Sequence, residues 1–172
     1  MVIIQEKVAG LSEAALGKFL ARARRATRLR GAVSVLVTGS RELRGLNHRF
    51  RGTNKATDVL SFPAMPSLLR DFAGDVAISA EIAARNARLL GHTTAEEIRI
   101  LTLHGLLHLA GYDHERDDGE MERMEARLRK SFGLPVGLIE RNGQSALSSD
   151  NSKSSRRVRR RVASRRTKRA SP

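Results

Sequence analysis

Three histidines within eleven residues are the part of this sequence best suited to chemistry. His104, His108 and His114 stand in the segment HGLLHLAGYDH. His104 and His108 are four residues apart, so a helix over them would place both imidazoles on one face, with Cβ atoms about 5–6 Å apart. Gly111 permits a positive φ that ends the helix and turns the chain, so that His114 can approach the other two. Three neutral imidazoles suit tetrahedral Zn²⁺ and leave its fourth position open, so the spacing predicts one zinc ion per chain.

The simplest alternative is that these histidines are ordinary core or surface residues. A lone histidine on an apolar helix face is usually of that kind, but several unpaired imidazoles among leucines would be costly to bury. A second alternative is a zinc protease, because H-x3-H-x2-G-x2-H is also the ligand spacing of the metzincins. In that class a glutamate general base follows the first histidine, whereas Gly105 stands there in this sequence. Met121 and Met124 fall in a helical pattern rather than a Met-turn, which also argues against proteolysis.

Three aspartates are the carboxylates that we consider as partners of such a site. Asp113 precedes His114 and is a candidate to orient an imidazole through a hydrogen bond, although a solvated turn residue would stand equally well there. Asp58 and Asp75 fall in or at the start of expected strands among apolar neighbours, where a buried carboxylate needs a partner. For these two we expect either a ligand-orienting or general-base role, or local hydrogen bonds in a cap or turn.

The elements that must position these residues follow from the hydrophobic periodicity. The segment from Thr93 or Thr94 to about Leu109 is apolar nearly all round, which is typical of a buried central helix. The remaining segments predict strands over 2–8, 32–37, 57–63 and 74–79, and helices over 12–29, 41–50, 79–90 and 119–132. The expected fold class is α/β (α+β): a small mixed sheet packed with about five helices, the central one carrying two zinc-ligand histidines.

Positive charge is concentrated at the carboxyl end of the chain. The 172 residues include 32 Lys and Arg against 18 Asp and Glu, a net charge of +14. Residues 151–172 contain 10 of the basic residues and none of the acidic ones. The segment 142–172 is rich in Ser and Arg, which predicts a disordered basic tail after a folded domain over 1–141. This tail is either a solvated extension or a non-specific RNA-binding arm.

Several classes of function are excluded by motifs that the sequence lacks. It has no cysteine, which excludes a disulfide scaffold, a thiolate zinc finger and a cysteine nucleophile. It has no GxGxxG, Walker A or GxSxG motif, so we expect no nucleotide cofactor and no serine nucleophile. We find no secretory signal and no apolar stretch of about 18 residues, and therefore expect a cytoplasmic protein without a membrane partner. With five Phe, one Tyr and no Trp, binding of nucleic acid would rest mainly on charge and weaken steeply with salt.

Three blocks of sequence together resemble a known family. The segment HGLLHLAGYDH over 104–114 is similar to the HGxLHLxGYDH signature of the bacterial YbeY endoribonucleases. Upstream, LNHRFRG over 46–52 and ATDVLSFP over 56–63 resemble the N-x-x-FRG and TDVLSFP block of that family. GDVAIS over 74–79 resembles its GDI-type strand. The resemblance covers about residues 2–135, with the blocks in the same order.

This resemblance implies a single-strand-specific, zinc-dependent endoribonuclease that acts on ribosomal RNA and the small ribosomal subunit. The expected activities are maturation of the 3′ end of 16S rRNA and ribosome quality control. Zinc would be held by His104, His108 and His114, and the arginine of the FRG block, here Arg51, would be essential. One departure is that Thr53 and Asn54 stand where the family often has Lys-Asp, which alters charge beside the expected RNA groove.

The chemistry of phosphodiester hydrolysis assigns expected roles to these residues. Zinc would activate water or act as a Lewis acid on a phosphate oxygen. Arg51, always protonated and fork-shaped, would hold a non-bridging phosphate oxygen. We therefore expect Arg51 and His104 as the catalytic residues, with Asp113 and Asp75 as further candidates, and we expect Arg49, Arg51 and Lys55 to contact RNA. The alternative is a non-catalytic ribosome-assembly factor with structural zinc, although structural sites usually close with four ligands.

Overall fold

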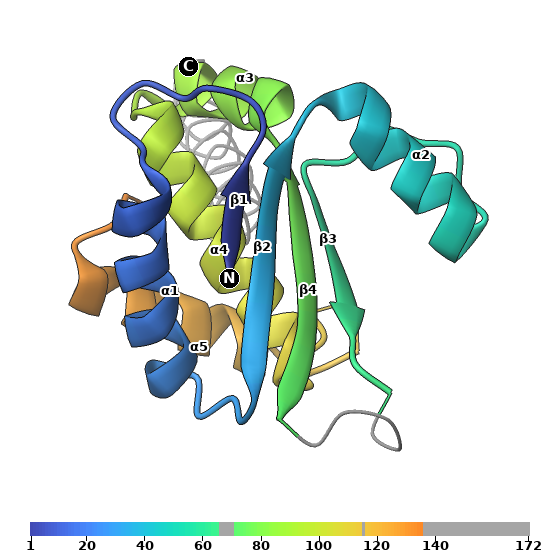
Figure 1. The fold of residues 1–172 in the computed structure, drawn as a ribbon. Coiled ribbons are helices and arrows are strands. Elements are labelled where there is room, and N and C mark those ends of the chain that lie inside the picture. Colours follow the sequence, from blue (N-terminus) through green and yellow to red (C-terminus); the bar gives the residue numbers. More distant parts are fainter. Residues whose placement is uncertain (66–70, 115, 136–172) are drawn as a thin grey trace, which may run out of the picture. The chain divides into compact units, whose positions relative to one another are not determined.

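The computed structural model describes residues 1–65, 71–114 and 116–135 of the chain. Within these residues, four strands form a mixed sheet in the order β1-β2-β4-β3 (Figure 1). The strands are β1 (Val2–Ile4), β2 (Ala32–Thr38), β3 (Val59–Pro63) and β4 (Phe72–Ser79). β1 and β4 pair parallel to β2 on its two sides, whereas β3 pairs antiparallel to β4 and forms one edge of the sheet.

Five helices complete the part of the chain that the structure describes. They are α1 (Glu13–Ala26), α2 (Ser40–Arg51), α3 (Ala80–Leu90), α4 (Thr94–Leu109) and α5 (Glu120–Phe132). Figure 1 shows α1, α4 and α5 on one side of the sheet and α2 on the other side, next to β3. The small mixed sheet and its helices confirm the predicted fold class.

Alternation along the strands divides the core between the two faces of the sheet. On the α2 face, buried Ala77 of β4 packs with Leu60 of β3 and Leu43 of α2. On the α4 face, β4 presents buried Val76 and Ile78. The end of α2 bonds to Ser61 of β3 through Arg51, and α4 bonds to the same residue through Gly105, so both helices lie beside the same sheet edge.

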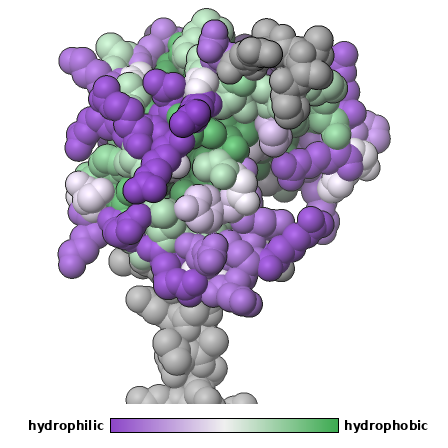
Figure 2. Space-filling model, turned by 90° about the horizontal axis from the view of Figure 1, so that it is seen from below, coloured by the Kyte–Doolittle hydropathy of each residue, from purple (hydrophilic) through white to green (hydrophobic). Residues whose placement is uncertain are grey.

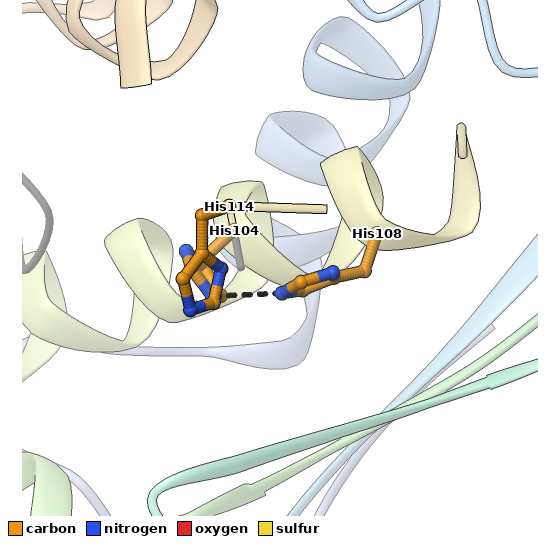
Figure 3. A group of neighbouring side chains, drawn as sticks. All are labelled: His104, His108 and His114. Carbon is orange, nitrogen blue, oxygen red and sulfur yellow. Dashed lines mark hydrogen bonds between the residues drawn. The ribbon is translucent and has the colours of Figure 1, made fainter. Parts of the chain in front are cut away.

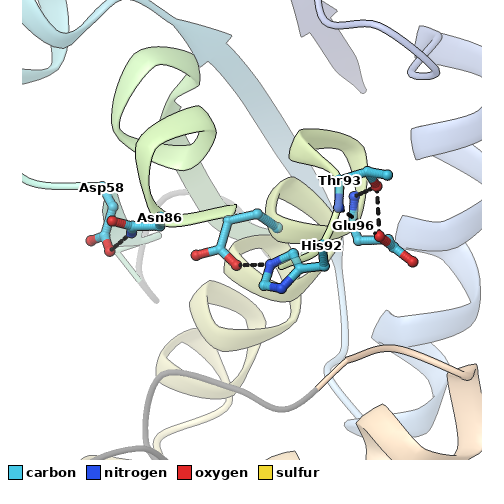
Figure 4. A network of polar contacts seen from close by, with 6 residues as sticks. Asp58, Asn86, His92, Thr93 and Glu96 are labelled. Atoms are coloured by element: carbon cyan, nitrogen blue, oxygen red, sulfur yellow. Dashed lines mark hydrogen bonds and ion pairs between the residues drawn. The ribbon is translucent and has the colours of Figure 1, made fainter. Parts of the chain in front are cut away.

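Helix α4 is buried along almost its whole length, as its sequence predicts. It begins with a capping box in which Thr93 Oγ1 accepts from the Glu96 backbone N–H, and the Glu96 carboxylate accepts from the Thr93 N–H (Figure 4). The side-chain hydrogen bond from Thr93 is the largest cause that lowers the pKa of Glu96. The sequence left Thr93 and Thr94 open as the cap, and the structure shows that Thr93 is the cap.

Gly105 allows α4 to lie unusually close to the sheet. A Cβ atom built at this position would lie 2.7 Å from Val76 Cγ1 and 3.0 Å from Ser61 Oγ. The approach is reinforced by a 3.2 Å hydrogen bond that Ser61 Oγ donates to the Gly105 carbonyl. A glutamate, as metzincins have at this position, would therefore collide with strands β3 and β4. The absence of the protease general base is thus a requirement of the packing.

Several predicted boundaries extend beyond the observed elements, including the strand predicted over 57–63, which begins at Val59. The first strand was predicted over 2–8 but ends at Ile4, and the helix predicted over 12–29 ends at Ala26. The helix stops because Arg28 adopts a left-handed φ of 57°, while its N–H bonds to Arg25 and the Leu29 N–H bonds to Arg24. This pattern is a Schellman motif, which usually has glycine at the left-handed position. Because arginine instead of glycine occupies the left-handed position, the sequence does not indicate that the helix ends here.

The predicted tail over 142–172 lies outside the described residues. None of the described helices has the length and apolar character needed to cross a lipid bilayer. Figure 2 shows the end of the molecule that faces down in Figure 1. Hydrophilic residues dominate this face, and hydrophobic residues are visible between them.

Candidate metal centre

The three predicted histidines converge at the carboxyl end of α4. His104 and His108 lie on its last two turns, and His114 follows a turn in which Gly111 has φ of 93°. One nitrogen from each imidazole lies within 4.8 Å of the others, and the ring centroids are 4.7–5.3 Å apart (Figure 3). His104 is buried, His108 is partly buried and His114 is exposed, so the group opens toward solvent on one side.

Hydrogen bonds on the outer nitrogens assign the tautomers of two of these rings. His108 Nδ1 lies 3.1 Å from the Tyr112 carbonyl oxygen, which can only accept, so the proton stands on Nδ1. His104 Nδ1 likewise donates to Glu125 Oε2 at 2.9 Å. In both neutral imidazoles this leaves the lone pair on Nε2, directed into the group.

The separation of these inner nitrogens suits a shared metal ion. His104 Nε2 and His108 Nε2 are 3.1 Å apart, and two lone pairs facing each other at that distance would repel (Figure 3). A tetrahedral zinc ion with bonds of about 2.0–2.1 Å holds two ligand nitrogens about 3.3 Å apart. Burial lowers the pKa of His108, and the neighbouring His104 and His114 lower it further. The donor set therefore fits a divalent metal that prefers neutral nitrogen ligands.

Glu125 is the residue of this group that the sequence interpretation missed. It lies on α5, is 2% exposed and makes a buried hydrogen bond with His104. The sequence does carry a signal, because Glu125 shares the buried helix face with Met121 and Leu128, at spacings of four and three residues. A carboxylate on an apolar helix face needs a partner inside the protein. Asp113 was one candidate for an orienting carboxylate, whereas Glu125 is the carboxylate that bonds to the imidazole of His104.

A cavity of about 450 Å³ joins the histidine group to the edge of the sheet. Its lining consists of Arg51, Val59, Ser61, Pro63, His104, His108, Gly111, Tyr112, Asp113 and His114. Arg51, the last residue of α2, reaches β3 and donates a hydrogen bond of 3.2 Å from Nη2 to the Ser61 carbonyl. The bond anchors one of the five guanidinium donors. The predicted arginine and the three histidines thus line one cavity although they come from distant parts of the chain.

The predicted aspartates have different positions. Asp113 lines the cavity, and its Oδ2 lies 3.5 Å from Arg116 Nε. Asp75 is exposed, and strand alternation places it on the sheet face opposite Val76, whose side chain contacts α4. The expectation of a buried Asp75 among apolar neighbours was therefore wrong. The error arose because the apolar residues beside Asp75 in sequence point to the other face.

Asp58 does not line the cavity, and its carboxylate bonds to its neighbour Val59 and to Asn86 of α3. Its Oδ1 accepts from the Val59 N–H at 2.9 Å, and its Oδ2 accepts from Asn86 Nδ2 at 3.3 Å (Figure 4). These bonds correspond to the cap-type alternative stated for Asp58. Arg49 and Lys55, the other predicted RNA contacts, are exposed at the end of α2 and in the segment after it, and neither belongs to the cavity lining.

The fold and this group of side chains together define an α+β protein with a candidate three-histidine metal site beside an arginine. Comparison with known sequences then gives the family: a model described as Endoribonuclease YbeY matches residues 2–133. The chain belongs to this YbeY family. It is 58% identical over 146 residues to an Endoribonuclease YbeY of Koribacter versatilis (strain Ellin345), an alignment that covers 85% of this chain and 94% of that protein.

Two further relatives extend the comparison. An Endoribonuclease YbeY of Solibacter usitatus (strain Ellin6076) is 46% identical over 141 residues, which are 81% of this chain and 92% of that protein. A solution structure of a protein from Thermotoga maritima is similar with a TM-score of 0.52 and 30% sequence identity. That similarity covers 77% of this chain and 90% of the solved one. The family resemblance identified from three short blocks is therefore confirmed over most of the chain.

Proposed function

We propose that this protein is a zinc-dependent endoribonuclease specific for single-stranded RNA, with one zinc ion per chain. The observation that carries the proposal is that three histidines able to bind a metal line the same cavity as Arg51. Membership of a family of endoribonucleases supports RNA as the substrate. The proposal includes ribosomal RNA of the small subunit, with maturation of the 16S 3′ end and ribosome quality control as its roles.

The bound metal would supply Lewis acidity toward a phosphate oxygen or a water molecule. His104, His108 and His114 would hold it through neutral imidazoles. The Tyr112 carbonyl and Glu125 keep protons on the outer nitrogens, which leaves the inner ones free to coordinate. The buried position of His104 limits its movement, so one side of the metal site is built into the core of the domain.

Arg51 would stabilise the charge that develops on the phosphate during cleavage. Its guanidinium is held in place at the Ser61 carbonyl before substrate arrives, which reduces the rearrangement needed in the transition state. The remaining donors of its planar fork match the non-bridging oxygens of a phosphodiester. Arg49 and Lys55 would contact phosphates outside the cavity, and Asp113 is a further candidate for a catalytic role because it lines the cavity.

The division of the chain supports an additional role for charge. We propose a catalytic domain over 1–141 and a basic tail over 142–172 that adds non-specific affinity for RNA. Residues 151–172 contain ten basic residues and no acidic residue, so their positive charge is not offset within the segment. Electrostatic binding of this kind would raise the local concentration of ribosomal RNA without selecting a cleavage site.

The first test compares cleavage of a ribosomal RNA fragment with single-stranded ends by the zinc-loaded wild type and by a folded His108→Ala variant. We expect the variant to lose both zinc and cleavage, while His48→Ala, which changes an exposed histidine of α2, retains both. Equal cleavage by wild type and His108→Ala would reject a metal-dependent nuclease. Zinc binding without any cleavage by the wild type would favour a non-catalytic assembly factor.

A second measurement tests the position of Arg51. We expect Arg51→Ala to lower kcat by about 10²–10³-fold, as the loss of a preorganised donor does in other enzymes. Arg41→Ala is the matched control, because it removes the same charge from the exposed first turn of α2. Equal effects of the two substitutions would show that Arg51 acts only through net charge.

A further inference from the structure

The last turn of α2 presents an aromatic side chain to solvent. Phe50 is 60% exposed, and it immediately precedes Arg51, which lines the cavity. All five phenylalanines of the chain lie within the described residues, and Phe50 is the exposed one among them. Single exposed apolar side chains are common on protein surfaces. One that lies beside a proposed active site, however, suggests a role in binding.

The position of the Phe50 ring is fixed by two neighbours. Its centroid lies 5.2 Å from that of Phe62 on β3, with an angle of 61° between the ring planes. The Arg49 guanidinium carbon lies 5.5 Å from the Phe50 centroid. The ring is thus held against the sheet at one end, while most of its surface is accessible. A ring fixed in this way loses little conformational entropy when a flat ligand packs on it.

The segment of the chain around Phe50 is basic, although exposed Asp75 of β4 pairs across the strands with Phe62, the neighbour of the ring. The segment 43–57 contains no Asp or Glu, and it contains Arg44, Arg49, Arg51 and Lys55. Phe50 lies between Arg49 and Arg51 in the sequence, so its ring could combine stacking with two guanidinium groups that can hold phosphates. This combination is how proteins bind single-stranded nucleic acid without sequence preference. Four basic residues in this segment, beside a proposed phosphate-cleaving site, favour RNA over an apolar protein partner.

We propose that Phe50 is a stacking platform for one base of single-stranded RNA, next to the phosphate held by Arg51. This inference rests on the proposed ribonuclease function and specifies how the substrate is recognised. Duplex RNA keeps its bases stacked on one another and cannot offer a free base to the ring. Phe50 therefore provides a physical reason for preferring single strands, which charge alone does not provide.

The absence of tryptophan from this chain allows a direct test. A Phe50→Trp substitution in the full-length, zinc-loaded protein introduces a single indole at the platform. We expect its fluorescence to be quenched by a short single-stranded oligoribonucleotide, because a base stacks on the indole. An oligomer of the same length with abasic nucleotides should bind through its phosphates and leave the fluorescence unchanged. Quenching that is equal for the two oligomers, or absent with both, would overturn the platform.

Affinity measurements with Phe50→Leu provide the second arm of the test. Leucine keeps an apolar contact with Phe62 but cannot stack on a base. Stacking on an aromatic side chain is worth about 1–3 kcal/mol per base, so we expect single-strand affinity to fall by about 5–150-fold. The slope of log affinity against log salt should stay unchanged, since no phosphate contact is lost, whereas Arg51→Ala should make it shallower.

The control is Leu89→Ala, which truncates a side chain of α3 that is 78% exposed and should leave RNA affinity unchanged. Thermal unfolding of each variant checks that the fold is retained. If wild type and Phe50→Leu bind single-stranded RNA equally, the platform is wrong while the ribonuclease proposal stands. If the zinc-loaded wild type binds no RNA, both proposals fail together.

Discussion

At the scale of single residues, the orientation of one imidazole depends on a buried carboxylate from another helix. Glu125 Oε2 accepts from His104 Nδ1 at 2.9 Å, which fixes both the tautomer and the plane of the ring. Carboxylates that support a metal-binding histidine in this way raise its basicity and hold it ready for the metal. The contribution of Glu125 should therefore appear in metal affinity before it appears in the cleavage step.

We expect Glu125→Gln to weaken zinc binding by about 10–100-fold, because the amide keeps an acceptor but loses the charge. Zinc affinity measured by competition with a chelator checks this, and excess zinc should restore much of the cleavage activity. Glu120→Gln, on the exposed first turn of the same helix, is the matched control and should leave zinc affinity unchanged. Equal zinc affinities of Glu125→Gln and wild type would show that the contact serves stability alone.

The residues of the site could be predicted where their spacing is local. The separations of His104, His108 and His114 lie within one helix and one turn, so their convergence follows from helix geometry. Glu125 comes from a separate helix, and no local sequence pattern predicts that the buried face of this helix packs against His104. Asp75 shows the opposite error, because neighbouring apolar residues do not tell which face of a strand an aspartate occupies.

At the scale of elements, the close contact between α4 and the sheet links folding to the site. Gly105 lies between His104 and the residues that lead to His108, and its missing side chain lets the helix settle on Val76 and Ser61. The same approach brings the histidines near β3, where Arg51 is anchored. Packing of one helix therefore determines the distance between the candidate metal ligands and the arginine.

The carboxyl end of α1 offers a test of local backbone strain. Arg28 has φ of 57°, a left-handed conformation that costs a residue with a Cβ about 1–2 kcal/mol. We expect Arg28→Gly to raise the free energy of unfolding by about 0.5–1 kcal/mol, since glycine recovers part of that cost but gains entropy in the unfolded chain. Urea denaturation measures the difference.

Arg25→Gly is the matched control for Arg28→Gly, because Arg25 lies in the regular last turn of α1 and is exposed. Glycine there should lower the free energy of unfolding by about 1 kcal/mol, the opposite sign for the same chemical change. A loss of stability in both variants would mean that the Arg28 side chain contributes more to the native state than its backbone strain removes.

At the scale of the whole molecule, the identity and order of the elements could be predicted because strands alternate and helices carry apolar faces. Every expected strand and helix is present among the described residues, with differences at the ends. The meeting of α2 and α4 at the β3 edge could not be predicted in this way. It depends on which strand β3 pairs with, and β3 pairs antiparallel with β4. Local sequence patterns do not determine such pairing between separate segments.

The uneven charge of the whole chain leads to the last prediction, which concerns residues 142–172. If the tail is an RNA-binding arm, its basic residues contact phosphates and release counterions, with a slope in log salt of about −0.7 per contact on single strands. Engagement of three of them would change the slope by about 2. We therefore expect a chain ending at residue 141 to bind RNA with a clearly shallower salt dependence than the full chain.

The same comparison separates charge from chain length. A full-length variant with Gln in place of the ten Lys and Arg residues over 151–172 keeps the length but loses the charge, and it should behave like the truncated chain. Zinc affinity should be equal in all three proteins, because the three histidines and Glu125 lie within the described domain. Cleavage at saturating RNA should also be equal, since Arg51 and the metal ligands are unchanged. An identical salt slope for all three proteins would show that the tail takes no part in RNA binding. RNA would then be bound by the α2 surface around Phe50.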